Sequence, residues 1–153
     1  MFFYGTLKRG GRYHSYCRGG RMTAEARIRG LLYDLPQGYP AIVVPEETVL
    51  AVGTDDPLAD ALADALGANG LARPDLAEAV TPAVYGELYT FDDPERRLPR
   101  LDVLEDFSPS NPSSPYRRVL VPVYPDGSDV TVAWAYAARH PRGTHLPGGR
   151  WPA

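Results

Sequence analysis

The chain has 153 residues, 44% of them hydrophobic and 23% charged, which fits one globular domain spanning 1–153 and excludes a wholly disordered chain. Sixteen basic and nineteen acidic residues give a net charge of −3, so composition alone does not favour nucleic-acid binding, and the single cysteine, Cys17, excludes an internal disulfide or a multi-cysteine zinc site. Because neither a signal peptide nor an apolar run of roughly 18 residues is present, we expect a soluble, cytoplasmic protein without membrane contact.

Short strands and turns are predicted for the first part of the chain. Met1–Tyr4 is an apolar, aromatic run that stops at Gly5, and it predicts a buried strand. Ala24–Leu35 predicts a longer strand, because its alternate apolar residues share one face. A turn over Gln37–Pro40, marked by its glycine and proline, leads into another predicted strand, Ala41–Val44.

The spacing of residues over 57–66 predicts a helix. Asp55 or Asp56 is suited to cap its start, and Gly67 suits the position after its end. Its apolar residues recur at helical spacing and predict one buried face. These residues are Leu58, Leu62, Ala65 and Leu66.

The segment 53–80 has the composition of a helical insertion, rich in Ala and Asp and bracketed by glycine and proline. A second, shorter helix is predicted within it over Pro74–Val80. Charge is uneven as well: 46–80 holds eight acidic residues and one basic, whereas 1–30 holds seven basic residues and one acidic. The main interpretation is a solvated surface whose halves offset each other, and a weaker one is a nucleic-acid contact through 8–29.

Strands and one helix are predicted for the remainder. Val84–Phe91 alternates as a strand does, and Pro99–Glu105 carries the apolar stripe of a short helix. The segment 106–115 has three prolines and four serines, so it must be a loop. Strands over 116–124 and 130–138 are joined by a tight turn and pair antiparallel. The sum is an α+β fold, a small mixed or antiparallel β-barrel flanked by short helices.

Two segments have features of a chemical site. The histidines are far apart and Cys17 has no catalytic motif, so we expect no metal site and no thiol nucleophile. The loop Tyr4–Leu7 follows a strand that stops at glycine, and its N–H groups form a nest for a carboxylate or oxyanion. Glu105 lies at the apolar edge of a helix end, where burial would raise its pKa and suit a general base. The alternatives are a plain tight turn and a surface glutamate.

Taken together and in order, several segments resemble the γ-glutamylcyclotransferase family in its broad, AIG2-like sense. The resemblance covers most of the chain outside 45–82 and the tail. YGTL alone is a weak signal, but the series at these separations is quite specific. The matching segments are FYGTLKRGG (3–11), GLLYDLPQGYPAIV (30–43), VYGELYTFDDPE (84–95), LDVLED (101–106), YRRVLVPVY (116–124) and TVAWAYAA (131–138).

The resemblance implies a small barrel with a cavity at one end and a reaction that needs neither metal nor cofactor. That reaction cyclises a γ-glutamyl group to 5-oxoproline and releases a free amine. Glu105 maps to the general base, and Asp106 stands where the family usually has glycine, so we expect the following turn to differ or to carry extra charge. The substrate-binding residues that it implies are Tyr4, Gly5, Thr6, Leu7, Tyr39 and Tyr116, of which the first four grip the γ-glutamyl group through backbone amides.

Two functions therefore stay open. The leading one is a γ-glutamylcyclotransferase acting on a small γ-glutamyl amine or amide, which would be its small-molecule partner. The alternative is a non-catalytic domain, either regulatory or binding a γ-glutamyl group or other carboxylate, that keeps the cavity but not turnover. In either case the loop 106–115 runs from Glu105 to Tyr116, and we hypothesise that it is a lid.

Overall fold

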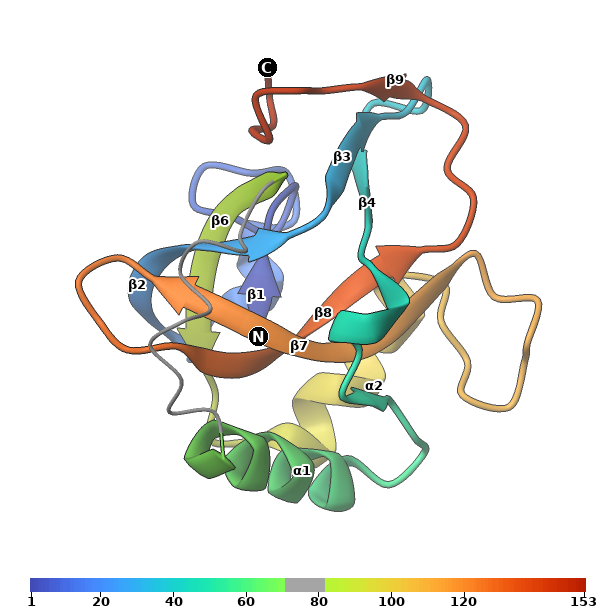
Figure 1. Ribbon diagram of the computed structural model, residues 1–153. Coiled ribbons are helices and arrows are strands. Elements are labelled where there is room, and N and C mark those ends of the chain that lie inside the picture. The colour runs from blue at the N-terminus through green and yellow to red at the C-terminus, as the bar shows by residue number, and fades with distance from the viewer. Residues whose placement is uncertain (71–81) are drawn as a thin grey trace.

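The computed structural model describes residues 1–70 and 82–153 (Figure 1). Its elements are β1 (Phe2–Phe3), η1 (His14–Cys17), β2 (Arg21–Arg29), β3 (Leu31–Asp34), β4 (Pro40–Val43), η2 (Glu46–Thr48), β5 (Ala51–Val52), α1 (Pro57–Gly70), β6 (Ala83–Thr90), α2 (Pro94–Leu104), β7 (Tyr116–Pro125), β8 (Thr131–Ala138) and β9 (Thr144–His145).

A strongly curved antiparallel sheet forms a nearly closed barrel. Its strands run in the order β1-β6-β2-β7-β5. Strand β8 lies outside this order and also pairs with β7. A smaller sheet, in the order β4-β3-β9, closes the top in Figure 1, and both helices lie at the bottom. The predicted α+β, barrel-like fold is confirmed, and every strand pair among the described residues is antiparallel.

Strand β8 separates two parts of the core. Trp134 and Tyr136 pack in the cluster that includes the apolar side of α2, whereas Ala133 and Ala135 pack in the cluster inside the barrel. Large side chains therefore point toward the helices, and small ones fit the crowded interior, as the period-2 geometry of a strand requires. The predicted hairpin of 116–124 with 130–138 is confirmed.

The single strand predicted over Ala24–Leu35 is wrong, because the chain forms two strands in two sheets. β2 pairs with β6, β3 pairs with β4, and the break lies at Gly30. The Gly30 N–H donates to the carbonyl of Pro82 at 2.9 Å. A Cβ at this position would lie 2.8 Å from the Val43 carbonyl oxygen, so the close crossing of the two sheets requires glycine.

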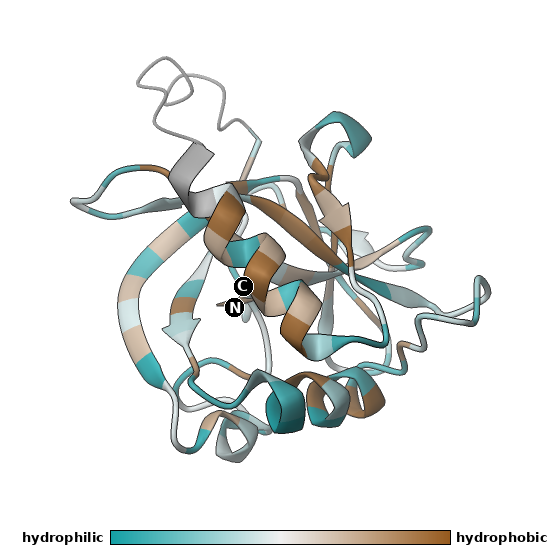
Figure 2. Ribbon diagram, turned by 90° about the horizontal axis from the view of Figure 1, so that it is seen from below, coloured by the Kyte–Doolittle hydropathy of each residue, from teal (hydrophilic) through white to brown (hydrophobic). Residues whose placement is uncertain are grey.

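The helix predicted over 57–66 is confirmed as α1, but it continues through Gly67 to Gly70, so the predicted end at Gly67 is wrong. The predicted buried face is wrong as well. Ala65 is exposed, and the exposed fractions of Leu58, Leu62 and Leu66 are 62%, 59% and 65% (Figure 2, where α1 carries brown segments). The residue that faces the interior is Asp60, which is 3% exposed. Its ionic partners, described below, determine which side of α1 faces inward.

Other boundaries differ in smaller ways. Asp56 caps α1, since its Oδ1 accepts the N–H of Ala59 at 3.1 Å. The helix predicted over Pro99–Glu105 begins earlier, because Pro94 supplies a favourable first position. The predicted helix over Pro74–Val80 lies outside the described residues.

Candidate active site

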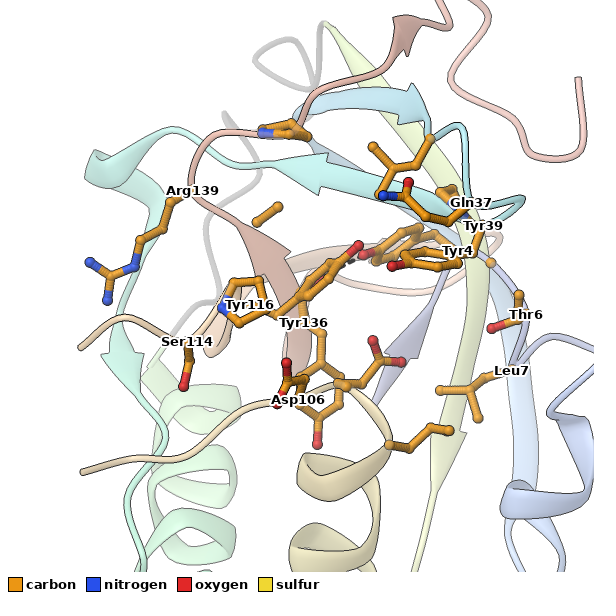
Figure 3. Close-up of a pocket in the computed structure, with 18 of the residues that line it drawn as sticks. Tyr4, Thr6, Leu7, Gln37, Tyr39, Asp106, Ser114, Tyr116, Tyr136 and Arg139 are labelled. Atoms are coloured by element: carbon orange, nitrogen blue, oxygen red, sulfur yellow. Dashed lines mark hydrogen bonds between the residues drawn. The ribbon is translucent and has the colours of Figure 1, made fainter. Parts of the chain in front are cut away.

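A cavity of about 620 Å³ opens beside the C-terminal end of α2 (Figure 3). Segments that are far apart in the sequence line it: the loop after β1, the turn before β4, the end of α2 and the start of β7. All seven residues singled out from the sequence lie on its wall. They are Tyr4, Gly5, Thr6, Leu7, Tyr39, Glu105 and Tyr116.

The loop after β1 offers unused hydrogen-bond donors. Among residues 1–70 and 82–153, no acceptor is found for the backbone N–H groups of Gly5, Thr6 and Leu7. The carbonyls of the same loop are engaged: Thr6 accepts the N–H of Tyr13 at 2.9 Å and Gly5 that of Lys8 at 3.1 Å. The loop is thus held in shape while three of its amides have no acceptor among the described residues, as an anion-binding loop requires.

Close packing fixes this loop from two sides. A Cβ at Gly5 would lie 2.5 Å from Cγ of Pro40, so the YGTL and GYP motifs touch at a point that only glycine allows. Below it, the Leu7 carbonyl accepts from Sγ of Cys17 at 3.4 Å and lies 3.0 Å from Nδ1 of His14. Burial raises the pKa of Cys17 to about 11, so this thiol stays protonated and is no nucleophile.

The backbone at Glu105 follows a common way of ending a helix. Glu105 is the C-cap of α2, and Asp106 has φ 52°, the sole positive φ at a non-glycine residue in the described chain. The Phe107 N–H donates to the Asp102 carbonyl at 2.8 Å and the Asp106 N–H to the Val103 carbonyl at 3.2 Å. This is a Schellman motif, in which glycine is preferred at the position of Asp106. Of the two expectations for this position, the structure shows the extra charge, because Asp106 adds a carboxylate to the lining of the cavity.

The Glu105 carboxylate is half-buried and unpaired. Burial alone raises its pKa to about 7, because neither a hydrogen bond nor a charge from the described residues compensates for lost water. A group that titrates near neutrality exchanges protons in both directions at physiological pH.

Tyrosine hydroxyls lie close to this carboxylate. The Tyr116 hydroxyl is buried and finds no hydrogen-bond partner among the described residues. Burial, and then the charge of Glu105, raise the pKa of Tyr116. Tyr4 has a raised pKa from burial and from Tyr116 and Glu105, and its hydroxyl donates to the Tyr136 carbonyl at 2.7 Å. An unsatisfied buried hydroxyl costs about 1–3 kcal/mol, so Tyr116 would gain from a polar ligand in the cavity.

A buried ionic cluster supports the floor of the site. Arg118 is 1% exposed and donates from Nε and Nη2 to both oxygens of Asp102, at 2.8 and 3.1 Å. Its Nη1 donates to Oδ2 of Asp60 at 2.9 Å, which joins α1 to the barrel. Tyr136 lines the cavity and donates its hydroxyl to Asp102 at 2.6 Å. Neither Tyr136 nor this cluster is predicted from the sequence, although Asp102 and Arg118 lie inside the quoted motifs.

The predicted loop over 106–115 is confirmed, and part of it faces the cavity. Pro112, Ser113 and Ser114 are among the lining residues. The loop closes on itself, since Oγ of Ser114 accepts the N–H of Ser108 at 3.0 Å. Its residues 109–113 are exposed, whereas Ser114 is buried.

Fold and site together define a small barrel-like α+β domain with an end cavity that combines free amides and an unpaired carboxylate. A family model described as "Gamma-glutamyl cyclotransferase, AIG2-like" matches residues 1–64 and 61–153. The chain therefore belongs to the AIG2-like γ-glutamyl cyclotransferase family. No curated protein gives a significant match.

Two crystal structures share this fold. YkqA from Bacillus subtilis is 20% identical with a TM-score of 0.60; the match covers 99% of this chain, which spans 38% of the length of YkqA. Uncharacterized protein PH0828 from Pyrococcus horikoshii is 19% identical with a TM-score of 0.54. That match covers 99% of this chain and 87% of the PH0828 chain. Within the described residues, no helix has the length and apolar character needed to cross a membrane. Those residues also contain no cluster of three or more His, Cys, Asp or Glu side chains suited to a metal.

Proposed function

We propose that this protein is a γ-glutamylcyclotransferase that converts the γ-glutamyl group of a small γ-glutamyl amine or amide into 5-oxoproline and releases the amine. The observation that carries the proposal is the unpaired Glu105 carboxylate, whose pKa is raised to about 7, in the same cavity as the free amides of Gly5, Thr6 and Leu7. Family membership supports the same class of reaction.

Each step of the reaction has a group suited to it. The Glu105 carboxylate takes a proton from the α-ammonium of the substrate, and the freed nitrogen attacks the γ-carbonyl carbon to form the ring. The electron pair of the carbonyl moves onto its oxygen, and the loop amides donate to that oxyanion. As the carbonyl re-forms, the bond to the leaving nitrogen breaks and Glu105 returns the proton to that nitrogen. The ring nitrogen then gives its second proton to Glu105, from which it passes to the released amine or to water, so that 5-oxoproline and the free amine are the products. Because the attack is intramolecular, holding the chain folded supplies much of the acceleration.

The polar groups near Glu105 suit recognition of the substrate. The unpartnered Tyr116 hydroxyl donates to a substrate oxygen, and Tyr39 lies on the wall contributed by the turn before β4. Burial of the substrate among these groups excludes water, which favours ring closure over hydrolysis.

The experiment measures 5-oxoproline release from a panel of γ-glutamyl amines, amino acids and peptides. Glu105→Gln keeps the shape of the side chain but accepts no proton, so turnover falls roughly 10²-fold or more. Asp106→Asn is the matched control, because it removes the neighbouring cavity carboxylate while asparagine tolerates positive φ; it keeps activity within about threefold.

The same panel distinguishes the non-catalytic alternative. A protein that binds γ-glutamyl ligands by calorimetry but releases no 5-oxoproline from any of them is a binding or regulatory domain. A fully active Glu105→Gln variant contradicts the assignment of the base and leaves the cyclotransferase class intact.

A further inference from the structure

A second hollow lies against the other half of α2 and shares no lining residue with the first cavity. Its volume is about 320 Å³. Four arginines, one serine and one aspartate line it: Ser15, Arg18, Asp93, Arg96, Arg97 and Arg100. The arginines come from two distant segments, the η1 region and α2.

Hydrogen bonds of Arg97 hold the walls of this hollow together. It is buried and donates from Nη1 to the carbonyl of Tyr16 at 2.6 Å and from Nη2 to that of Arg18 at 2.7 Å. It also donates from Nε and Nη2 to both oxygens of Asp93, at 3.2 and 3.1 Å. One buried guanidinium therefore fixes the η1 segment to α2 and neutralises Asp93, the one carboxylate that the described residues contribute to the hollow.

The other three arginines have no ionic partner in the described part of the chain. No carboxylate lies within 4 Å of the charged nitrogens of Arg18, Arg96 or Arg100, and all three residues are exposed. The Arg100 guanidinium stacks over the ring of Tyr16 at 4.8 Å, which restricts its position. Arg96 and Arg100 are four residues apart on α2, where like charges repel.

Three unpaired guanidinium groups around one small hollow match a tetrahedral oxyanion, because each offers a planar fork of donors. We propose that this hollow binds a phosphate-bearing small molecule through Arg18, Arg96 and Arg100. The hydroxyl of Ser15 provides a further donor at the wall. A bound anion relieves the repulsion between the arginines. It also links the η1 segment to α2, in addition to the link that Arg97 makes.

A small ligand fits better than a nucleic acid strand. The hollow has a volume of only about 320 Å³, and its basic residues come from two segments that meet there, the η1 region and α2. The Arg100 guanidinium covers one face of the Tyr16 ring, and the Tyr13 ring packs nearly perpendicular to it at 6.1 Å between ring centroids, so the ring is already engaged in two contacts that stacking on a base would compete with. The basic segment 8–29 therefore contributes Arg18 to a small-anion site rather than to a strand-binding track.

Calorimetry with the full chain and inorganic pyrophosphate tests this proposal, at constant ionic strength set with chloride. We expect saturable binding at one site, and about tenfold or more weaker binding in Arg96→Gln/Arg100→Gln. The matched control, Arg27→Gln/Arg150→Gln, removes the same charge from residues that line neither cavity and changes affinity less than about twofold. Circular dichroism checks that each variant is folded.

Three results would overturn the proposal. The first is the absence of saturable binding at millimolar pyrophosphate. The second is an equal loss of affinity in both double variants, which indicates a general charge effect. The third is tighter binding of single-stranded oligonucleotides that increases with their length and depends on Arg96 and Arg100, which indicates a nucleic-acid surface.

Discussion

Two carboxylates lie three residues apart at the end of α2, and their surroundings are opposite. Asp102 is buried and accepts three hydrogen bonds, two from Arg118 and one from Tyr136. Glu105 is half-buried and accepts none from the described residues. The two carboxylates therefore differ in their use. Asp102, whose hydrogen bonds are complete, fixes α2 in place, whereas Glu105 at the end of α2 has no partner among the described residues and is left reactive.

Helix α1 contributes to the same buried ionic cluster as Asp102. Asp60 of α1 supplies the second carboxylate to Arg118, and Thr54 holds Asp60 through its hydroxyl at 2.8 Å. The Trp134 indole adds a hydrogen bond to the Asp60 carbonyl at 3.1 Å. The segment predicted as an insertion is therefore tied to the helix that carries Glu105 by polar contacts, while its leucines face outward.

Breaking the satisfied cluster has the largest expected effect. Arg118→Met leaves Asp60 and Asp102 buried without their cation, so the free energy of unfolding falls by about 3–5 kcal/mol in urea denaturation. Arg117→Met is the matched control on the same strand, because its partner Glu46 is exposed and the loss stays below about 1 kcal/mol. Equal losses in the two variants would show that the cluster contributes no more to stability than the pair that Arg117 makes with the exposed Glu46.

The unsatisfied carboxylate predicts a pH dependence of stability. Burial raises the folded pKa of Glu105 from an ordinary value of 4.5 to about 7. A raised pKa means that the stabilisation from the protonated form is complete below pH 4.5 and is lost as pH rises through 7. Wild type should therefore lose up to about 3 kcal/mol relative to Glu105→Gln over this interval, as urea unfolding at several pH values measures. A difference that does not vary with pH would place Glu105 in water.

The same titration sharpens the proposed chemistry. A base must be ionised in the free enzyme, so kcat/KM should rise tenfold per pH unit below 7 and level off above it. Asp106→Asn should keep this profile, whereas the residual activity of Glu105→Gln should lack it. A profile that is flat between pH 5 and 8 in wild type would exclude Glu105 as the titrating base.

The features that can be predicted from the sequence are those whose signals are local. The cap at Asp56, the hairpin of β7 and β8 and the apolar stripe of α2 each depend on residues within a few positions of one another. Glu105 and the YGTL loop were found because short motifs carried them, and the structure places them on one cavity.

Features that depend on a residue far away in the sequence cannot be predicted in this way. The leucines of α1 have perfect helical spacing, yet the side of α1 that faces inward is set by Arg118, which lies 58 residues beyond Asp60. The break at Gly30 depends on the backbone of Val43 and Pro82. Arg97 appears as one of several surface arginines in the sequence, and its buried role depends on carbonyls about 80 positions away. Periodicity contains none of this information.

A change in the loop over 106–115 shows whether its exposed residues affect catalysis. Replacing residues 109–113 with a Gly/Ser linker of equal length keeps the Ser108–Ser114 hydrogen bond and removes only exposed side chains. If the loop is a lid, KM or the preference among leaving amines changes several-fold while the melting temperature stays nearly constant. Ser114→Ala is the contrasting variant, because it deletes the hydrogen bond between the buried Ser114 hydroxyl and the Ser108 N–H and should lower stability instead. Unchanged kinetics on the whole substrate panel would leave the loop without a role.

The smallest expected effect concerns the turn that follows Glu105. Asp106 adopts φ 52° at the Schellman position, where glycine carries no steric penalty, and its negative charge opposes the dipole at the end of α2. Asp106→Gly removes both penalties but adds freedom to the unfolded chain, so we expect a net stabilisation of about 0.5–1 kcal/mol. Asp106→Asn removes the charge and keeps the side chain, which separates the two contributions by urea denaturation. Because the two Schellman hydrogen bonds use the backbone alone, Glu105 stays in place and 5-oxoproline release should change less than about twofold. Destabilisation by Asp106→Gly would show instead that the Asp106 side chain holds the turn together.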